Sequence, residues 1–477
     1  MVRVAASVYG GERRAPGPRG RFLVGNLRDF RGDRLLDTME HNWAQYGDIV
    51  RFCVGPRTVH VVSHPDLAHQ VLTKEKERFP RIHEGSDTKI GLGLVFGDGL
   101  LTNRDHDSWF ARRRMLQPVF HRRRIATMAD EMVAAGWKML SRWEELYTSG
   151  DVFDIHKEMM QVTLEVISRT MFGANVTGEV GRVGPAVTVA ARYAFAHLQN
   201  PFPVPRWVPT RRNQDFRRAL ETIDSLVLDL IRARQLARDS DGEARGDLLD
   251  MLLDAEDAET GERMTEAEVL DEVKTIFGAG HETTANALTW TWLLLSEHPE
   301  VGEVLRAELD AVLGGHLPTL ADLPNLPYTK QVFDEVMRLY PPVPAVIRRA
   351  ERATTLGSYE IPAASRILIS IYNVHRHPEF WQNPTRFEPE RFSPERGASH
   401  HGSAYMPFGA GQHKCIGNNL ALMEGPLLLA MIAQRYELDL APGCSVEREV
   451  AVTMRPKKGL YVSLRPRQGM SAGNRWC

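Results

Sequence analysis

Cysteine is scarce in this chain of 477 residues, which contains only Cys53, Cys415, Cys444 and Cys477. No two of them form a C-x-x-C pair, and this spacing argues against zinc sites and iron–sulfur clusters. So few cysteines in so long a chain are typical of a reducing compartment. We therefore expect a cytoplasmic protein.

The chain also lacks a strong charge imbalance and a long apolar run. Its 59 basic and 61 acidic residues give a net charge of −2, which does not point to nucleic acid or a membrane surface. No window reaches the roughly 18 consecutive apolar residues that a membrane span requires. The N-terminal stretch MVRVAASVYGGERRAPGPRGRF has no apolar core of a secretion signal. These absences predict a chain without a membrane anchor.

A short β-rich region comes first in the chain. Residues 49–54 and 58–62 are rich in β-branched and aromatic residues and flank Gly55 and Pro56, so they are expected to form a hairpin. Pro65 is expected to open a short helix directly afterwards.

Helical periodicity dominates the chain that follows. It extends from about residue 105 to 300 and is interrupted at 199–210, where several prolines forbid a continuous helix. Residues 235–262 are charged and are expected to form a solvated connection. A further helix is expected near 328–340, before the two prolines at 341 and 342.

The longest predicted helix follows Thr265. Thr265 and Glu268 form a capping box at its start, and Pro299 is expected to end it. About 32 residues at 1.5 Å each give a rod of roughly 48 Å, long enough to cross the protein.

These patterns predict a mainly α fold with a minor β subdomain. One domain is expected over residues 21–466, between a flexible tail at 1–20 and a C-terminal tail at 467–477. The β-rich parts are expected near 49–72 and 343–372, and the helical parts at 105–340 and 415–435.

The segment FGAGQHKCIG at 408–417 holds a single cysteine in a glycine-rich loop before an apolar helical run. Glycines let backbone approach a flat ligand, and surrounding N–H groups stabilise a thiolate that can bind a metal. A lone cysteine is more often only structural. Here, however, Phe408, Gly411, His413, Cys415 and Gly417 fit F-x-x-G-x-[RH]-x-C-x-G, and the segment closely resembles the haem-binding loop of the cytochrome P-450 family.

A second motif, AGHETT, begins at Ala279 in the middle of the long helix and resembles the family pattern [AG]-G-x-[DE]-T-[TS]. Ala279 and Thr283 are four residues apart and therefore share a face. A small residue and a hydroxyl on that face leave space and a hydrogen bond above an iron. Glu282 is expected to relay protons from solvent. The alternative is a buried helix with a polar patch, which an acid beside two threonines makes less attractive.

A third motif is EVMR, in which Glu335 and Arg338 are three residues apart on a helix. It is followed by PERF, which contains Arg391. The resemblance implies that these three residues form a buried network that braces the haem loop, with a structural role.

A fourth motif is WFARR, in which Trp109 and Arg113 are spaced by four. The resemblance implies that both face a haem propionate, and that His413 meets the same group. Arg348 is in a position where the family often places another propionate partner. Arg349 is the rival assignment, and a solvated face remains the alternative for Arg348.

The resemblance covers roughly residues 20–466 in the right order. It implies haem b as the cofactor, bound through the Cys415 thiolate to iron, whose electron donation favours O–O cleavage. The residues expected to contact the haem are Cys415, Phe408, Gly409, His413, Gly417, Trp109, Arg113, Arg348 and Ala279. Thr283 and Glu282 are the expected catalytic residues. The implied reaction inserts one oxygen atom from O2 into a C–H bond or a double bond.

Electrons must come from another protein, because the chain has neither an iron–sulfur motif nor room for a fused flavin domain. We expect a ferredoxin or flavodoxin with an NAD(P)H-dependent reductase. The expected docking residues are His121 to Arg124, Arg112, Arg114 and Lys414. A solvated face is the alternative for this charge run.

The substrate is expected to be a hydrophobic small molecule, such as a terpenoid, fatty acyl or polyketide-like compound of secondary metabolism. The residues expected to line its pocket are Ile82, Ile90, Leu92, Val95, Phe96, Phe195, Phe202, Ala279, Val343, Ala345, Val346, Val452 and Thr453, with His83 and His197 as candidate polar contacts. Many of these residues could equally belong to the core.

Two other functions remain open at this point. One is a haem-thiolate peroxygenase or isomerase, which needs no electron partner. The other is a non-catalytic haem sensor. Glu282 and Thr283 disfavour both, because family members of the first kind tend to lose the acid–threonine pair and a sensor has no use for a proton relay.

Overall fold

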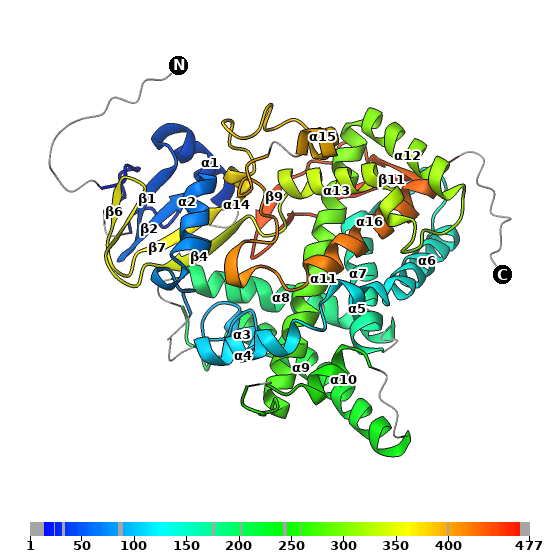
Figure 1. Ribbon diagram of the computed structural model, residues 1–477, viewed down its shortest axis with the longest axis horizontal. Coiled ribbons are helices and arrows are strands. Elements are labelled where there is room, and N and C mark those ends of the chain that lie inside the picture. Colours follow the sequence, from blue (N-terminus) through cyan, green and yellow to red (C-terminus); the bar gives the residue numbers. More distant parts are fainter. Residues whose placement is uncertain are drawn as a thin grey trace.

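A computed structural model describes residues 14–22, 24–30, 34–83, 89–173, 177–200, 203–241, 246–257, 259–397 and 400–467. Figure 1 shows β1, β2, β4, β6 and β7 gathered at one side of the molecule, while helices make up most of the rest, with β9 and β11 among them. The mainly α fold with a minor β part is confirmed.

The helices and strands follow the chain in an order that alternates long helical runs with short strand pairs. The helices are α1 (Leu35–Tyr46), α2 (Pro65–His69), α3 (Gly93–Phe96), α4 (His106–Leu116), α5 (Arg122–Ala126), α6 (Ala129–Leu146), α7 (Ile155–Phe172), α8 (Thr177–Gln199), α9 (Arg211–Asp241), α10 (Leu248–Asp254), α11 (Glu266–Glu297), α12 (Pro299–Leu313), α13 (Pro327–Leu339), α14 (Ile371–Val374), α15 (Pro394–Gly397) and α16 (Asn418–Arg435). The strands are β1 (Ile49–Val54), β2 (Arg57–Val62), β3 (Val152–Asp154), β4 (Ala345–Arg349), β5 (Thr354–Leu356), β6 (Tyr359–Ile361), β7 (Arg366–Ser370), β8 (Tyr436–Leu440), β9 (Arg448–Val450), β10 (Met454–Pro456) and β11 (Tyr461–Pro466).

The largest sheet joins distant parts of the chain in the order β1-β2-β7-β4. The predicted hairpin is confirmed, with Ile49 opposite Val62 and a turn at Gly55, whose φ of 59° favours glycine. Strand β2 pairs in parallel with β7, and β4 pairs antiparallel with β7. The C-terminal half of the chain therefore completes a sheet that the N-terminal half begins.

The long helix α11 has the predicted start. The Thr265 side chain accepts the Glu268 N–H, and the Glu268 carboxylate accepts the Thr265 N–H, so both halves of the capping box are present. The helix ends at Glu297, and Pro299 then begins α12. Helix α11 packs against α7, α13 and α16 and is buried along most of its length. Figure 1 shows it running through the middle of the helical part.

The connection expected at 235–262 is wrong in part. Helix α9 continues to Asp241, and α10 forms within this segment. Leu248, Leu249 and Leu252 of α10 are buried. Their spacing gives α10 one apolar face, and burial of that face outweighs the charged composition around it.

The two expected tails are described only in part. Residues 1–13 and 468–477 lie outside the described chain. Ala15 is 2% exposed, and the carbonyl oxygen of Pro16 accepts the N–H of Arg51 at 2.7 Å, so this part of the expected tail packs along β1. In the part of the chain that the structure describes, no helix has the length and apolarity to cross a bilayer.

Candidate active site

The cysteine loop is held in shape by its own backbone. The N–H of Cys415 donates to the carbonyl oxygen of Phe408 at 2.9 Å, which closes the loop before α16 begins. Gly409 and Gly411 have φ of 69° and 71°, where side chains are strained. A Cβ at Gly411 would also lie 2.0 Å from the carbonyl oxygen of Leu72. The glycines are thus required by the turn and by this close approach, and the loop presents Cys415 at its end.

The Cys415 side chain combines exposure with confinement. It is exposed, yet burial among protein atoms is the largest effect on its thiol and raises its pKa. The Gly417 N–H and the charges of Arg113 and Lys414 oppose the rise in pKa. These groups favour the thiolate, and a bound metal ion would deprotonate the thiol outright.

A basic cluster surrounds His413. Burial, followed by the charges of Arg81, Arg348, His106 and His83, lowers the pKa of His413 to about 2. Every one of these neighbouring charges opposes protonation of His413. Arg81 and Arg348 are the permanent cations of this cluster, so it is suited to a ligand that brings negative charge.

His83 supports the same conclusion. Burial and the charges of Arg81 and Arg348 lower its pKa to about 3. Its Nε2 atom is buried and has no hydrogen-bond partner within the described residues. An orphaned polar atom beside several cations fits a missing acidic ligand. An exposed thiol at the end of a glycine-rich loop and a basic cluster two residues away are a donor set that fits haem, with its iron and its propionates.

The two residues of the WFARR motif lie in this region. The Trp109 ring is 4.2 Å from the His413 ring, and Arg81 lies over Trp109 at 5.2 Å. The Trp109 indole N–H donates to the carbonyl oxygen of Leu100 at 3.0 Å. Arg113 is close enough to Cys415 for their charges to interact. The propionate roles of Trp109 and Arg113 stay predictions.

Arg348 and Arg349 were rival assignments, and the structure separates them. Arg348 is 8% exposed and belongs to the basic cluster around His413. Arg349 is half-exposed and lies 4.0 Å from Glu351. Arg348 therefore lies among the residues expected to meet a propionate, and its propionate role stays a prediction.

The middle of α11 presents the second motif. Ala279 is exposed although it lies halfway along a buried helix, and Thr283 is half-buried on the same face. The Thr283 hydroxyl donates to the carbonyl oxygen of Ala279 at 3.0 Å. Its oxygen can still accept a hydrogen bond. This face can therefore border a ligand that fills the space beside Ala279.

Glu282 is on a different face of α11 and is 7% exposed. Its Oε1 atom accepts a hydrogen bond from the Thr453 hydroxyl at 2.6 Å and lies 3.5 Å from Arg455. Thr453 was expected in the substrate pocket. It is 4% exposed and its hydroxyl binds Glu282, because the adjacent Met454 of β10 is held by Trp290 of α11. Its place in the pocket stays a prediction.

The three residues of the bracing network lie together as predicted. Glu335 accepts hydrogen bonds from Arg338 at 2.7 and 2.8 Å and from Arg391 at 2.9 Å, and all three side chains are buried. Arg338 also donates to the carbonyl oxygen of His375 at 2.7 Å, and His375 accepts the Met406 N–H at 2.8 Å. The network thereby reaches the segment that precedes the cysteine loop.

The other predicted pocket residues differ in burial. Val95 and Phe96 belong to the core, and the Phe96 ring lies so close to Gly278 that a Cβ there would be 2.6 Å from it. Phe202 lies outside the described residues. The half-buried members are Ile82, Ile90, Leu92, Phe195, Val343, Ala345, Val346 and Val452.

Glu424 is a buried acid that sequence reasoning missed, although an acid inside the apolar run of α16 was a visible signal. It is 2% exposed, and its Oε1 atom has no hydrogen-bond partner in the described part of the chain. Burial raises the pKa of Glu424 to about 8, and a hydrogen bond with Thr284 opposes this rise. The folded protein therefore holds a proton on Glu424 that the unfolded chain loses above its ordinary pKa of 4.5.

We expect this proton to make stability depend on pH. Because the folded-state pKa is raised, the wild-type free energy of unfolding should fall, relative to Glu424→Gln, as pH rises from about 4.5 to 8. The relative change should be on the order of 3 to 5 kcal/mol and should level off above that range. Urea unfolding of the haem-loaded proteins across this range measures it. Glu303→Gln, an exposed position on α12, is the control, and a flat difference between wild type and Glu424→Gln would contradict the prediction.

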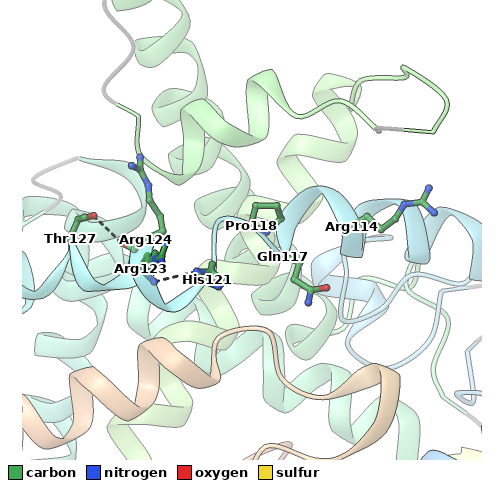
Figure 2. A pocket seen from close by; sticks show the side chains of 7 residues that line it. All are labelled: Arg114, Gln117, Pro118, His121, Arg123, Arg124 and Thr127. Carbon is green, nitrogen blue, oxygen red and sulfur yellow. Dashed lines mark hydrogen bonds between the residues drawn. The ribbon is translucent and has the colours of Figure 1, made fainter. Parts of the chain in front are cut away.

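A hollow of about 720 Å³ opens where α4 gives way to α5 (Figure 2). It is lined by Arg114, Gln117, Pro118, His121, Arg123, Arg124 and Thr127, and none of these is a predicted catalytic or pocket residue. The amide of Asn419, at the start of α16, donates to the carbonyl oxygen of Phe120 at 3.2 Å, so the hollow adjoins the helix that follows the cysteine loop.

Two of the predicted docking residues are not free for a partner. Arg112 is 6% exposed and pairs with Glu268 at 2.7 Å and Glu272 at 3.3 Å. Arg114 pairs with Asp257 at 2.7 Å. The sequence could not show this, because each partner is more than a hundred residues away.

Comparison with known proteins agrees with the site. The cytochrome P450 family model matches residues 15–463. Cyclooctatin synthase of Streptomyces melanosporofaciens is 35% identical over 430 residues, which cover 90% of this chain and 87% of that protein. Cyclooctat-9-en-7-ol 5-monooxygenase of the same organism is 35% identical over 406 residues, which cover 84% of each chain.

A solved structure agrees as well. The crystal structure of the cytochrome P450DA heme domain superposes with a TM-score of 0.85 at 27% identity and covers 95% of this chain and 98% of that chain. With a cysteine loop, a basic cluster and an acid–threonine pair already in place, these matches show that the chain belongs to the cytochrome P450 family and is a haem-dependent P450 monooxygenase.

Proposed function

We propose that this enzyme hydroxylates or epoxidises a terpenoid-like cyclic hydrocarbon or alcohol. The observation that carries the proposal is the exposed Cys415 side chain at the end of its glycine-rich loop, close enough to Arg113 for their charges to interact and two residues from His413 and its basic cluster. The relatives' names support the substrate class, since one of them describes a monooxygenase that acts at position 5 of cyclooctat-9-en-7-ol. The apolar, half-buried residues that were predicted for the pocket fit such a substrate.

We propose haem b as the form of the cofactor, since the chain has no C-x-x-C-H sequence for covalent attachment. Cys415 would bind its iron, while Arg113, Arg348, His413 and Trp109 would hold its propionates. Phe408 and the glycines at 409 and 417 would shape the thiolate side. When bound, haem activates O2 for insertion of one oxygen atom into the substrate.

The protein's own part in the reaction is to bind, orient and protonate. Apolar side chains would hold the substrate and exclude water beside Ala279. In the balanced reaction, the substrate and O2 take up two electrons and two protons and yield the oxygenated product and water. The Thr283 hydroxyl would accept one hydrogen bond and donate another, and the Glu282 carboxyl group would supply protons.

Turnover with labelled O2 tests this function and separates it from its alternatives. Electron-dependent product that carries the oxygen label supports the monooxygenase. Product formed only with hydrogen peroxide would favour a peroxygenase or isomerase, and haem binding without any product would favour a sensor.

A cytoplasmic location is part of the proposal, because Cys53, Cys415 and Cys444 are free thiols.

P450 monooxygenases need a redox partner, and we propose a ferredoxin or flavodoxin for this one. The docking surface is the basic face, defined as His121, Arg122, Arg123, Arg124 and Lys414. Four of these are exposed and Arg124 is half-buried, and the described residues place no carboxylate in ion-pair contact with them. An acidic partner docked here would lie beside the cysteine loop.

Reversing charge on the basic face is expected to slow reduction by the partner. Arg122→Glu with Arg123→Glu should lower the rate about tenfold or more at low salt, and less at high salt, because the attraction is screened. Haem content should stay the same. Stopped-flow reduction measures the rate, and Arg57→Glu, at the exposed start of β2, is the control. Unchanged reduction in the double variant would remove the docking proposal.

A further inference from the structure

The carboxylate of Glu282 is held by a hairpin from the C-terminal part of the chain. Thr453 donates to its Oε1 atom at 2.6 Å, and Arg455 Nη1 lies 3.5 Å from the same atom. Glu282, Thr453 and Arg455 are 7, 4 and 3% exposed. His156, whose Nε2 atom is 3.1 Å from Asn286 Oδ1, is close enough to Glu282 for their charges to interact. The acid is therefore enclosed by polar side chains.

The position of Arg455 is fixed by backbone contacts. The Trp290 indole N–H of α11 donates to the carbonyl oxygen of Met454 at 3.1 Å, and the Met454 N–H donates to the carbonyl oxygen of Pro342 at 2.8 Å. These bonds attach β10 to α11 two turns beyond Glu282. Arg455 is thus delivered to the acid by a strand that α11 itself holds in place.

Arg455 also connects Glu282 to the surface. Arg455 is the cross-strand partner of Glu449 in the β9–β10 hairpin, and its Nε atom lies 3.3 Å from Glu449 Oε2. The same oxygen is 3.2 Å from Nη2 of Arg192, which is half-exposed on α8. The four residues form an ion-pair chain, Glu282–Arg455–Glu449–Arg192, in which charges of opposite sign alternate.

This ion-pair chain joins two helices that have different functions. Helix α11 carries Glu282 and Thr283, whereas α8 carries Arg192 and, one turn later, Phe195 of the expected pocket wall. Removing one partner of a buried ion pair is strongly unfavourable, because the other charge remains buried. Arg455 also has a buried Nη2 atom with no partner in the described chain, so Glu282 and Glu449 are the carboxylates that hold it.

We propose that Arg455 is a positioning residue for proton delivery, and that Glu449 and Arg192 couple it to α8. Arg455 holds the Glu282 carboxylate in one orientation, from which Glu282 passes a proton toward Thr283 and regains one from solvent water. A substrate that moves α8 changes the contact between Arg192 and Glu449 and thereby the hold on Glu282. The inference rests on the proposed function, because it assigns Glu282 the proton step.

The test compares Arg455→Gln with Arg455→Lys, using Glu282→Gln as the benchmark. Glu282→Gln is expected to reduce turnover about a hundredfold. Arg455→Gln should lower the product formed per electron pair several-fold, release more hydrogen peroxide and increase the solvent isotope effect on product formation. Arg455→Lys should recover most of the loss, since it restores the charge. Arg192→Gln should show the same signature more weakly.

A readout that needs no turnover is the unfolding midpoint in urea. The shifts of Glu282→Gln and Arg455→Gln should be clearly non-additive in the double variant, because the two side chains form one buried pair. Arg465→Gln is the matched control, because Arg465 is an exposed arginine on β11 with its own ion pairs. It should leave the product formed per electron pair unchanged, and its unfolding shift should add to that of Glu282→Gln.

The outcomes separate the inference from the function on which it rests. Wild-type enzyme without a thiolate-type spectrum or O2-dependent product would overturn the proposed function. Normal wild-type turnover with unaltered product yield and isotope effect in Arg455→Gln would overturn the inference alone, as would additive unfolding shifts. If Arg455→Gln does not fold, Glu449→Gln and Arg192→Gln are tested in its place. An unchanged yield of product per electron pair in both would overturn the link to α8.

Discussion

Cys415→Ser is expected to abolish the thiolate-type carbon monoxide difference spectrum and oxygen-dependent turnover. A serine hydroxyl is a far weaker acid than a thiol and is not deprotonated by the neighbours that favour the thiolate, namely Arg113, Lys414 and the Gly417 N–H. Without a thiolate ligand the iron loses the electron donation that favours O–O cleavage. The fold should survive, because the side chain is exposed and serine is nearly the same size.

The measurement is a reduced-plus-carbon-monoxide difference spectrum, together with haem content and product yield. Cys444→Ser is the matched control, since Cys444 is also a free thiol but lies far along the chain after α16. It should leave the spectrum and the activity as in the wild type. Persistence of the thiolate-type band in Cys415→Ser, or its loss in Cys444→Ser, would show that Cys415 is not the ligand.

Glu335→Gln is expected to produce the largest loss of stability, about 3–5 kcal/mol in the free energy of unfolding. Glu335 is the only carboxylate that Arg338 meets within ion-pair distance among the described residues, and both side chains are 0% exposed. Its Oε1 atom also accepts the Glu388 N–H at 3.0 Å. A neutral amide would leave the buried Arg338 guanidinium without a countercharge and Arg391 with Glu388 alone, and would direct its own N–H groups at donors.

The change should also reduce haem loading. Arg338 fixes His375, and His375 fixes Met406 just ahead of the cysteine loop, so loosening the network loosens the ligand loop. Urea unfolding and haem content measure both effects. Glu447→Gln removes an exposed pair with Lys457 and should have a much smaller effect. Equal midpoints for the two variants would mean that the network does not brace the fold.

Local chemistry explains what could be predicted from the sequence. The hairpin around Gly55 and the capping box at Thr265 each depend on residues a few positions apart, and both are present. The cysteine loop is similarly local, because its glycines set the turn that presents Cys415. Element type and site position follow from such short-range patterns.

Errors arose where distant segments decide the environment of a side chain. Arg112 looked like a docking residue beside other arginines, but α11 supplies Glu268 and Glu272 and buries it. The hydrogen bond from Thr453 to Glu282 was likewise not visible in the sequence, because 171 residues separate the two. The sequence names a charged or hydroxyl residue in the same way whether its side chain is in water or beside a buried partner, so sequence alone cannot distinguish the two cases.

The sequence by itself determined the cysteine loop that carries Cys415, the neighbouring Glu282 and Thr283 and the helical framework, because each depends on spacing along one segment. Only the tertiary structure decided which charges meet and which are buried: the basic cluster around His413, the pairing of Arg455 with Glu282 and the burial of Glu424 beside Thr284. The physical reason is that electrostatic and desolvation energies depend on distances and burial between segments far apart in the chain. Those distances are set only when the chain folds and α11 packs against segments that precede and follow it in the sequence, such as α7 and α16.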